Sequence, residues 1–539
     1  MKLNIEQQEC KEKILQFLSE KKNDYFGIYG AGGTGKTFTL SNTINEFKGS
    51  VLFLGATNKV VTVLKSSLES SGFSNPKVKT IDSFLKFKIQ KDEFNNSTIS
   101  YTFPSIKTIP ELLVIDEVSM ITNQKFKLIE DLKKHCKIIL IGDFLQLPPI
   151  EDNKDSVVRN SDGFLVSKIF TAVKKENSYT LTIQNRQKDG TELSSLVSGF
   201  RNHMHLKIDP IKLAEKKHNN LDIQYYFTND PKLKDEIKRN NCVAVCFKNL
   251  SVLNFNWLIG STKSMRKDYR LNEINIGDFL MFDSFYFYEK NRIKTSFYTS
   301  NIIEVIEIET GLTETFTIKE KIKKVITYSI LKVKDGEEIR EVRYIQGGLY
   351  GQNGGGLSSS VYGQRKTYTE HINKGKNVKE NIDFLKDLNT RFSNYQNSFA
   401  KLKKPYAITA HKAQGSTYNT VIIPVYDYYT KFYKDANQLL YVALSRAKEK
   451  VIFVNKKEQF GETDKRKLFT EFEKQSICSA YDYKCVDCRT DLLDREFDID
   501  HKIPLASGGK NSVENLQPLC KKCHTKKSNY EKFSKQYKK

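Results

Sequence analysis

The sequence has no apolar run long enough to cross a lipid bilayer, which argues against a membrane-spanning protein. Its start, MKLNIEQQEC, lacks the apolar core of a signal peptide, so we expect a soluble, intracellular protein without one. Acidic residues are scarce relative to basic ones, with 64 Asp and Glu against 87 Lys and Arg. The net charge of +23 favours a polyanionic partner, because Lys and Arg displace condensed counterions from phosphates. A well-solvated surface is the other explanation of that charge.

The 539 residues exceed what one hydrophobic core organises, and about three or four domains are expected. Cysteine is used unevenly: four of the nine cysteines form two C-x-x-C pairs near the end of the sequence. In a reducing compartment such pairs indicate metal ligands, not disulfides. Cys242 and Cys246 in CVAVC share one face of an expected strand, and we interpret them as core residues.

A phosphate-binding loop is present near the start of the sequence. The β-prone stretch 25–29 is followed by GAGGTGKT at 30–37, which is the full G-x-x-x-x-G-K-T pattern. Its glycines let backbone N–H groups surround the phosphates of ATP, and the next helix adds its positive N-terminus. We expect Lys36 to contact the β- and γ-phosphates and Thr37 to hold Mg²⁺. The glycines expected around the phosphates are Gly30, Gly33 and Gly35.

Two short apolar runs further along predict buried parallel strands that end at this site. The run 112–115 ends in Asp116 and Glu117. Asp116 is expected to bind the Mg²⁺ of ATP, and Glu117 to orient or deprotonate the attacking water. The second run, 137–141, leads into GDFLQLPP, where Gln146 is placed to contact the γ-phosphate.

Together with the phosphate loop, DEVSM at 116–120 and GDFLQLPP at 142–149 resemble the first motor lobe of superfamily 1 helicases of the RecD/Dda-like branch. The segment 3–7 resembles the adenine-reading motif, with Gln7, or alternatively Gln8, on the base. Residues 56–59 and 80–85 resemble the two DNA-contact motifs. The second of these departs from the family pattern, because Asp82 stands where the family usually has histidine. An acid beside a DNA backbone would repel it.

The later motifs of that branch follow in order. Arg186 in NRQ and Arg446 in LYVALSRA match the two arginine fingers of the family. Gln414 lies in TAHKAQGST, which resembles the motif that couples ATP hydrolysis to DNA binding. Guanidinium groups suit the finger role because they are always charged and clamp phosphate oxygens. The resemblance implies an α/β fold of two RecA-like lobes, 1–190 and 191–454, that closes on ATP and moves 5′→3′ along single-stranded DNA.

Two insertions are expected within the lobes. Residues 86–108 read as a β-hairpin, which in the resembled helicases separates the strands. Tyr101 or Phe103 would then stack on a base at the fork; the alternative is that both rings pack the hairpin onto its lobe. Residues 270–400 are strand-rich and, by the resemblance, form a β-barrel-like insertion. Within it, the Gly/Ser-rich tract 347–363 is expected to be a flexible loop.

A separate module is expected after a charged linker or helix at 455–480. In residues 481–539 the two C-x-x-C pairs predict one tetrahedral structural Zn²⁺ site. This metal would supply much of the folding energy of so small a module. The four ligands are Cys485, Cys488, Cys520 and Cys523.

Three features resemble an HNH endonuclease of the zinc-bound ββα-metal type. They are DHKIPLASGG and NLQPL between the cysteine pairs and a histidine directly after the last cysteine. The resemblance implies that His501 is the general base and that Asp500 and His524 hold Mg²⁺ or Mn²⁺. Asn515 would orient His501 or its loop. A zinc ribbon that only binds DNA would explain the cysteines but not Asp500, His501 and His524.

The sequence therefore predicts an ATP-dependent DNA helicase coupled to a metal-dependent endonuclease, acting on single-stranded and duplex DNA with no membrane partner. The alternatives are a plain helicase whose zinc module anchors DNA, and a translocase whose ATPase gates cutting without unwinding. The composition, rich in Lys, Asn, Ile and Tyr, indicates an AT-rich genome. A cytoplasmic protein encoded by a bacterium, phage or virus is expected.

Overall fold

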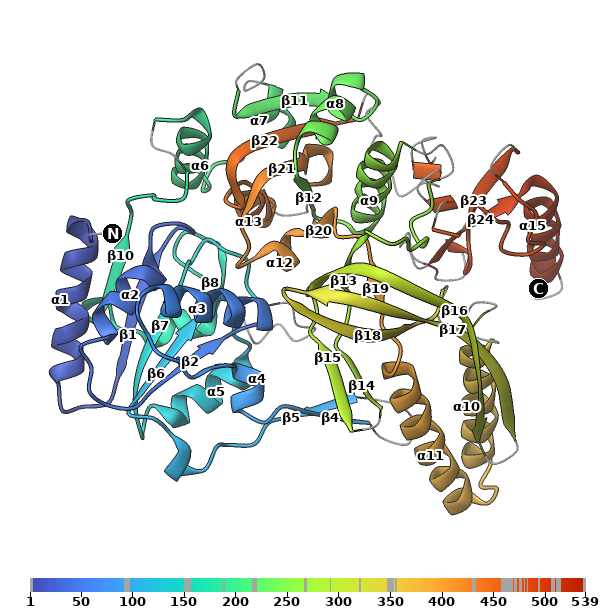
Figure 1. Ribbon diagram of the computed structural model, residues 1–539, viewed down its shortest axis with the longest axis horizontal. Helices are drawn as coiled ribbons and strands as arrows, with labels where there is room; N and C mark the ends of the chain where they lie inside the picture. Colours follow the sequence, from blue (N-terminus) through green and yellow to red (C-terminus); the bar gives the residue numbers. More distant parts are fainter. Residues whose placement is uncertain are drawn as a thin grey trace.

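The structure is a computed structural model. It describes residues 3–91, 97–149, 157–187, 190–215, 221–265, 269–290, 292–318, 321–346, 353, 356–428, 433–456, 469, 473–474, 477–478, 480–481, 483–492, 495–505, 509 and 515–536. These residues form two α/β lobes, an antiparallel insertion and a C-terminal module (Figure 1). None of the helices in these ranges is both long and apolar enough to cross a membrane.

Lobe 1 is built on a six-stranded parallel sheet with the order β10-β1-β7-β6-β2-β3. One face is covered by α1, α2 and α3 and the other by α4 and α5, which buries the central strands on both sides. The carboxyl ends of the strands meet at one edge, where the phosphate loop follows β1. The strands are β1 (Tyr25–Gly30), β2 (Val51–Gly55), β3 (Val78–Thr80), β6 (Leu112–Asp116), β7 (Lys137–Gly142) and β10 (Ser178–Leu181), and the helices α1 (Ile5–Ser19), α2 (Lys36–Ile44), α3 (Asn58–Ser70), α4 (Ile81–Phe84) and α5 (Asn123–Leu132).

Lobe 2 has a five-stranded parallel sheet with the order β11-β22-β21-β12-β20. Leu147 and Phe164 of lobe 1 are buried in the core of lobe 2, so the lobes share apolar packing. Cys242 and Cys246 are buried in β12, as expected for core residues. The strands are β11 (Ile223–Phe227), β12 (Cys242–Cys246), β20 (Ala407–Thr409), β21 (Tyr418–Pro424) and β22 (Ala447–Asn455), and the helices α6 (Glu192–Asn202), α7 (Pro210–Glu215), α8 (Pro231–Arg239), α9 (Asn249–Ser264), α12 (Ala410–Ala413) and α13 (Tyr433–Leu444).

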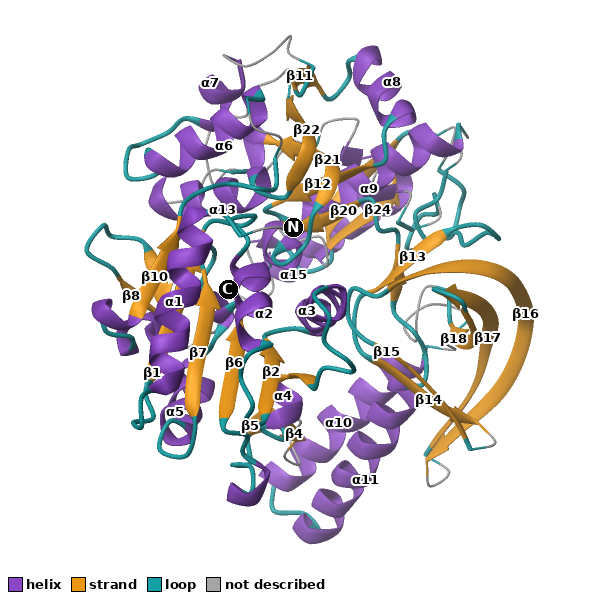
Figure 2. Ribbon diagram, turned by 60° about the vertical axis from the view of Figure 1, so that its left-hand side comes forward, coloured by secondary structure: helices purple, strands orange, loops and turns teal. Residues whose placement is uncertain are grey.

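The insertion of lobe 2 is only partly what the sequence predicted. Its antiparallel sheet has the order β18-β17-β16-β13-β19, but two long helices follow the strands and pack against each other (Figure 2). The expectation of strands up to residue 400 was therefore wrong for this part, as was a loop over 357–363, where α10 begins. The rest of the Gly/Ser tract, apart from 353 and 356, lies outside the described residues. The elements are β13 (Phe279–Phe282), β14 (Tyr286–Lys290), β15 (Ile293–Phe297), β16 (Ile302–Ile318), β17 (Ile322–Asp335), β18 (Glu338–Tyr344), α10 (Leu357–Asn373), α11 (Val378–Asn397) and β19 (Leu402–Lys403).

The hairpin predicted in lobe 1 is present, since β4 (Lys88–Lys91) pairs antiparallel with β5 (Ser97–Ser100) and extends away from the lobe (Figure 1). Tyr101 and Phe103 lie at its base and pack against the core of lobe 1. The ring of Tyr101 lies 5.5 Å from that of Phe87, and the ring of Phe103 lies 6.2 Å from that of His135. This arrangement favours the packing interpretation of the two rings.

The C-terminal module is a ββα unit. Strands β23 (Phe497–His501) and β24 (Leu516–Cys520) pair antiparallel, and α15 (Lys521–Gln536) follows directly. The module has its own small core, which includes two of the expected zinc ligands, Cys485 and Cys523. The module lies beside α9 of lobe 2 in both ribbon views.

Candidate ATPase and nuclease sites

The phosphate loop connects β1 to the first turn of α2, so that its backbone N–H groups and the helix N-terminus face one cavity. Gly33 and Gly35 adopt the left-handed region, with φ values of +96° and +83°. A Cβ atom at Gly33 would lie 2.4 Å from Cβ of Arg186, and one at Gly35 would lie 2.4 Å from Nε2 of Gln7. The backbone conformation therefore favours glycine at both positions, and at Gly33 the Cβ of Arg186 also leaves no space for a side chain.

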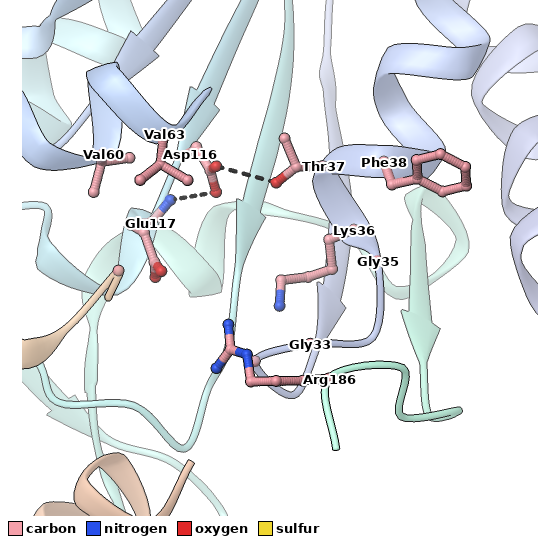
Figure 3. Close-up of a pocket in the computed structure, with 12 residues that line it drawn as sticks. Gly33, Gly35, Lys36, Thr37, Phe38, Val60, Val63, Asp116, Glu117 and Arg186 are labelled. Carbon is pink, nitrogen blue, oxygen red and sulfur yellow. Dashed lines mark hydrogen bonds between the residues drawn. The ribbon is translucent and has the colours of Figure 1, made fainter. Parts of the chain in front are cut away.

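The loop surrounds a cavity of about 210 Å³ into which Lys36 projects (Figure 3). The Lys36 ammonium donates hydrogen bonds to the carbonyl oxygens of Gly30 and Ala31, each at 2.8 Å. Burial lowers the pKa of Lys36, against the attraction of nearby carboxylates. When a nucleotide binds, the Lys36 ammonium can replace these contacts with charge-assisted hydrogen bonds to the phosphate oxygens.

Thr37 and Asp116 meet at the other wall of this cavity. The Thr37 hydroxyl donates to Oδ2 of Asp116 over 3.3 Å, so two hard oxygen donors lie where Mg²⁺ would bind. Burial and the charge of Glu117 raise the pKa of Asp116 to about 6. Glu117 has a left-handed φ of +54°, and its N–H donates to Oδ1 of Asp116 at 2.8 Å. Such a conformation in a residue other than glycine carries strain, which concentrates at functional sites.

Lobe 2 and the segment leading to it bring two arginines to the loop. Arg186 lines the cavity and donates to the carbonyl oxygen of Ser445 at 2.7 Å. Arg446 is fully buried, and its Nη2 lies 3.2 Å from where a Cβ of Gly32 would be. Burial and the charge of Arg446 lower the pKa of Arg186 to about 10, which leaves it protonated at neutral pH. Two guanidinium groups therefore converge on the phosphate loop.

The three glutamines expected at the nucleotide make different contacts. Gln7 donates to the carbonyl oxygen of Thr34 at 3.2 Å and caps its own helix through Asn4. Gln414 does not line the cavity; it donates to the carbonyl oxygen of Leu147 at 3.1 Å and so links the lobes. Gln146 Oε1 is buried and has no hydrogen-bond partner among the described residues.

The segments resembling DNA-contact motifs follow β2 and β3 at the same edge of the sheet. Thr57 and Thr80 cap α3 and α4. Lys59 donates to the Tyr418 hydroxyl of lobe 2 at 3.3 Å. Asp82, the departure from the family pattern, forms an ion pair with Lys125 at 2.7 Å. The repulsion expected from Asp82 is therefore offset by an adjacent cation.

The four predicted zinc ligands lie together. Their sulfur atoms are all within 4.8 Å of one another, and Sγ of Cys488 lies 3.7 Å from Sγ of Cys520. A tetrahedron with Zn–S bonds of about 2.3 Å has edges of about 3.8 Å, so the spacing fits a zinc ion. Hydrogen bonds with Thr490 lower the pKa of the exposed Cys488 thiol to about 6.

The nuclease residues lie on the ββα unit. Asp500 Oδ1 on β23 lies 3.9 Å from Nε2 of His524 on α15, a separation that one divalent cation can bridge. Lys527 contacts the other oxygen of Asp500 and the carbonyl oxygen of His501. A carboxylate and an imidazole suit Mn²⁺ or Mg²⁺, so the residues present fit the metal expected there.

Asn515 holds the loop after His501. Its side chain accepts from the N–H of Ile503 and donates to the carbonyl oxygen of Ile503, each at 2.9 Å. The main-chain carbonyl oxygen of Asn515 also accepts a hydrogen bond from the N–H of Lys502 at 2.7 Å. Of the two roles considered for Asn515, these contacts favour orientation of the loop.

Sequence reasoning missed Asp498. Its Oδ2 lies 2.8 Å from Nδ1 of His524, and its Oδ1 accepts from Lys521 at 2.9 Å. The available signal was the spacing in FDIDH, because residues 498 and 500 share one face of a strand. A carboxylate on one imidazole nitrogen commonly fixes a metal-binding histidine, so Asp498 belongs to this site.

Three family models match separate parts of the chain. An AAA domain matches residues 15–152, a UvrD-like helicase C-terminal domain matches 404–454, and an HNH endonuclease matches 485–530. The AAA match covers the phosphate loop and the two apolar strands that end at the ATP site. The UvrD-like match covers the segment around Gln414 and Arg446, and the HNH match covers the zinc and nuclease residues.

Full-length relatives are similar over most of the chain. An uncharacterized protein of Acanthamoeba polyphaga mimivirus is 27% identical over 513 residues, covering 84% of this chain and 99% of its own length. The ATP-dependent DNA helicase dda of Enterobacteria phage T4 is 24% identical, covering 82% and 96%. The ATP-dependent DNA helicase Pif1 of Campylobacter jejuni is 23% identical, covering 84% and 92%. A crystal structure of Pif1 helicase from Bacteroides in complex with ADP-AlF3 and ssDNA is 16% identical, covering 89% and 97%, with a TM-score of 0.43.

The fold and the two sites define a two-lobed P-loop ATPase that carries a zinc-type nuclease module. The chain is a superfamily 1 helicase of the Pif1/Dda-like group with a C-terminal HNH endonuclease domain. It thus combines the domains of an ATP-dependent DNA helicase and an HNH endonuclease domain in one polypeptide.

Proposed function

We propose that the protein moves 5′→3′ along single-stranded DNA, unwinds duplex DNA ahead of it and cuts DNA with its HNH module. The observation that carries the motor part is the convergence of Arg186 and Arg446 on the phosphate loop opposite Asp116 and Glu117. An ATP site completed by residues from both lobes links hydrolysis to lobe movement, because the γ-phosphate decides whether the arginines are engaged.

In this proposal Lys36 and the two arginines stabilise the charge that develops on the transferred phosphate. Glu117 accepts the proton of the attacking water from its position beside Asp116. Thr37 and Asp116 would hold Mg²⁺, which would supply charge that neutralises the phosphates. Gln146, whose buried Oε1 has no partner within the described part of the chain, contacts the γ-phosphate or the attacking water. Gln7 reads the adenine from its place beside the phosphate loop.

At the nuclease site His501 takes the proton from the attacking water. Asp500 and His524 would hold a divalent cation, which would supply charge that stabilises the scissile phosphate and the leaving oxygen. Asn515 keeps the loop that follows His501 in place. The lysines of α15 lie on the same module, and a net charge of +23 suits a protein that holds duplex and single-stranded DNA at once.

The experiment is cleavage of a 5′-tailed DNA duplex by purified protein with Mg²⁺, with and without ATP, compared with a 3′-tailed duplex. Unwinding confined to 3′ tails refutes the polarity. His501→Ala is expected to abolish cutting and to keep ATPase activity, while Lys36→Ala is expected to lose ATPase and unwinding. Cutting that persists in His501→Ala assigns the cleavage to another site.

The plain-helicase alternative makes a different prediction for the same assay. A zinc module that only anchors DNA gives unwinding and no cut in any lane. The close approach of Asp500, His524 and Asp498 argues for the nuclease, because a structural ribbon needs only its four cysteines. A third possibility, a translocase that gates cutting, is supported instead if strands are cut but never displaced.

A further inference from the structure

The sequence contains one tryptophan, Trp257, and it lies where lobe 2 meets the nuclease module. Trp257 is on α9, and its indole Nε1–H donates to the hydroxyl of Tyr483 at 3.2 Å. A second contact lies nearby, because Asn272 Nδ2 donates to the carbonyl oxygen of Ala480 at 2.5 Å. Both partners in the module come shortly before Cys485, the first zinc ligand.

Tyr483 is fixed within the module itself. It is only 1% exposed and packs in the core that also holds Cys485 and Cys523. Its N–H donates to the carbonyl oxygen of Cys478 at 3.0 Å, and its carbonyl oxygen accepts from Leu492 at 2.7 Å. Its φ of +55° lies in the left-handed region, which a side chain adopts only where its surroundings impose it. The contact with Trp257 therefore joins two rigid parts.

The segment that enters the module is also attached to lobe 2. Lys456 directly follows the last strand of lobe 2, and its ammonium pairs with the buried carboxylate of Glu473 at 2.8 Å. The same ammonium lies 4.4 Å from the centre of the Tyr426 ring. An ion pair with a buried partner is costly to open, because opening leaves an uncompensated charge.

From these contacts we infer that Trp257 docks the nuclease module on lobe 2 as a fixed attachment, and that zinc binding maintains the dock. Zinc ligation organises the small core that holds Tyr483, so loss of the metal releases the partner of Trp257. While docked, the module moves with lobe 2 as ATP opens and closes the motor. The movement of the module with lobe 2 during ATP hydrolysis rests on the proposed function, whereas the zinc-dependent dock does not.

The dock is tested by the fluorescence of the full-length protein, because all indole emission comes from Trp257. Chelation that removes zinc is expected to shift the emission to longer wavelength, and added Zn²⁺ to reverse the shift. Zinc content is measured in parallel, and ATPase activity in excess Mg²⁺ shows that the motor stays folded. Unchanged emission after measured loss of zinc, with the motor active, overturns the dock.

Tyr483→Phe is the matched variant, since it removes the hydroxyl and keeps the ring in the core. It is expected to retain zinc and to change the emission before any chelation. Retained zinc with wild-type emission would contradict the Trp257–Tyr483 contact. If Tyr483→Phe loses zinc, it is a second zinc-free form of the protein. Its emission should then match that of the chelated wild type, and a different emission also overturns the dock.

The mechanical step is tested by Trp257→Phe, which keeps a ring on α9 but loses the N–H donor. DNA-stimulated ATPase and ATP-independent cutting are expected to match the wild type, while the ATP-dependent change in cutting is lost. The same ATP dependence in the variant overturns the transmission through Trp257. If wild-type cutting itself ignores ATP, the proposed coupling fails, while the emission experiment still decides the dock.

Discussion

Asp143 of lobe 1 accepts a hydrogen bond from the hydroxyl of Tyr441 of lobe 2 over 2.9 Å. The same carboxylate oxygen accepts one from Arg201 on α6, also at 2.9 Å. Asp143 is fully buried and lies three residues before Gln146, and Tyr441 lies five residues before Arg446. A buried charge thus connects the segment expected to contact the γ-phosphate with the helix that precedes Arg446, the residue expected to act as an arginine finger.

This connection predicts the effect of Asp143→Asn. The substitution keeps the shape but removes the charge opposite Arg201, so we expect a loss of about 1–3 kcal/mol in the free energy of unfolding. We also expect a lower kcat of the DNA-stimulated ATPase at little change in KM for ATP, because lobe closure is affected more than nucleotide binding. Thermal unfolding and steady-state kinetics measure both effects.

Tyr441→Phe is the milder companion of that variant, since it removes one donor and retains the charge pair. A loss of about 0.5–1.5 kcal/mol and a smaller reduction in kcat are expected. A rise in KM alone in Asp143→Asn, with kcat unchanged, would contradict a role in closure and indicate a role in nucleotide binding.

Asp498 makes a second prediction, at the nuclease. Partial burial opposes its charge, but hydrogen bonds from Lys521 and His524 outweigh this effect and lower the pKa of Asp498. Asp498 fixes the His524 ring so that Nε2 faces Asp500. Asp498→Asn is expected to weaken the affinity for the divalent metal by about 10–100-fold, as is typical of such outer partners. Cutting measured against Mn²⁺ concentration gives this affinity.

Lys521→Ala provides the control, because Lys521 pairs with the other oxygen of the same carboxylate from an exposed position. Its metal dependence should stay close to that of the wild type. Equal weakening in both variants would show that the charge near Asp498 matters, and not its contact with His524.

The zinc site gives a third prediction. Cys520→Ser is expected to lose zinc and the fold of the module, while ATPase activity persists because the motor has its own cores. Cys478→Ala is the matched variant: Cys478 is buried in the same core but lies outside the group of four ligands. Metal analysis should find zinc in Cys478→Ala and none in Cys520→Ser; zinc bound equally by both would refute the four-cysteine site.

Local motifs predicted which residues lie together at each candidate site, since Lys36, Thr37 and the four cysteines lie in short patterns whose chemistry dictates the spacing. Elements fixed by distant partners were harder. α10 and α11 lie in a region that was predicted to be strand-rich. Their apolar faces pack on the antiparallel sheet, and the sequence alone does not show that this sheet is their partner. The contacts of Asp143 with Arg201 and Tyr441 span 58 and 298 residues, so no local pattern indicates them.

Asp82 shows how a departure from a family pattern is compensated, and it gives the last prediction. Its carboxylate lies in the 80–85 segment expected to contact DNA and pairs with Lys125 at 2.7 Å. Lys125→Ala leaves a negative charge near the phosphates, so single-stranded DNA should bind more weakly. Asp82→Asn leaves a positive charge, so binding should tighten. Both changes should be about 1 kcal/mol or less, since both groups are reached by solvent, and both should shrink as salt increases.

The double variant separates this compensation from two independent effects. If the pair acts as a unit, Asp82→Asn combined with Lys125→Ala restores nearly wild-type affinity, because the net local charge is again zero. Fluorescence anisotropy of a labelled oligonucleotide over a range of salt concentrations measures all four proteins. Unchanged binding in both single variants would place the 80–85 segment away from the DNA path, and the resemblance of that segment to a DNA-contact motif would then concern the fold alone.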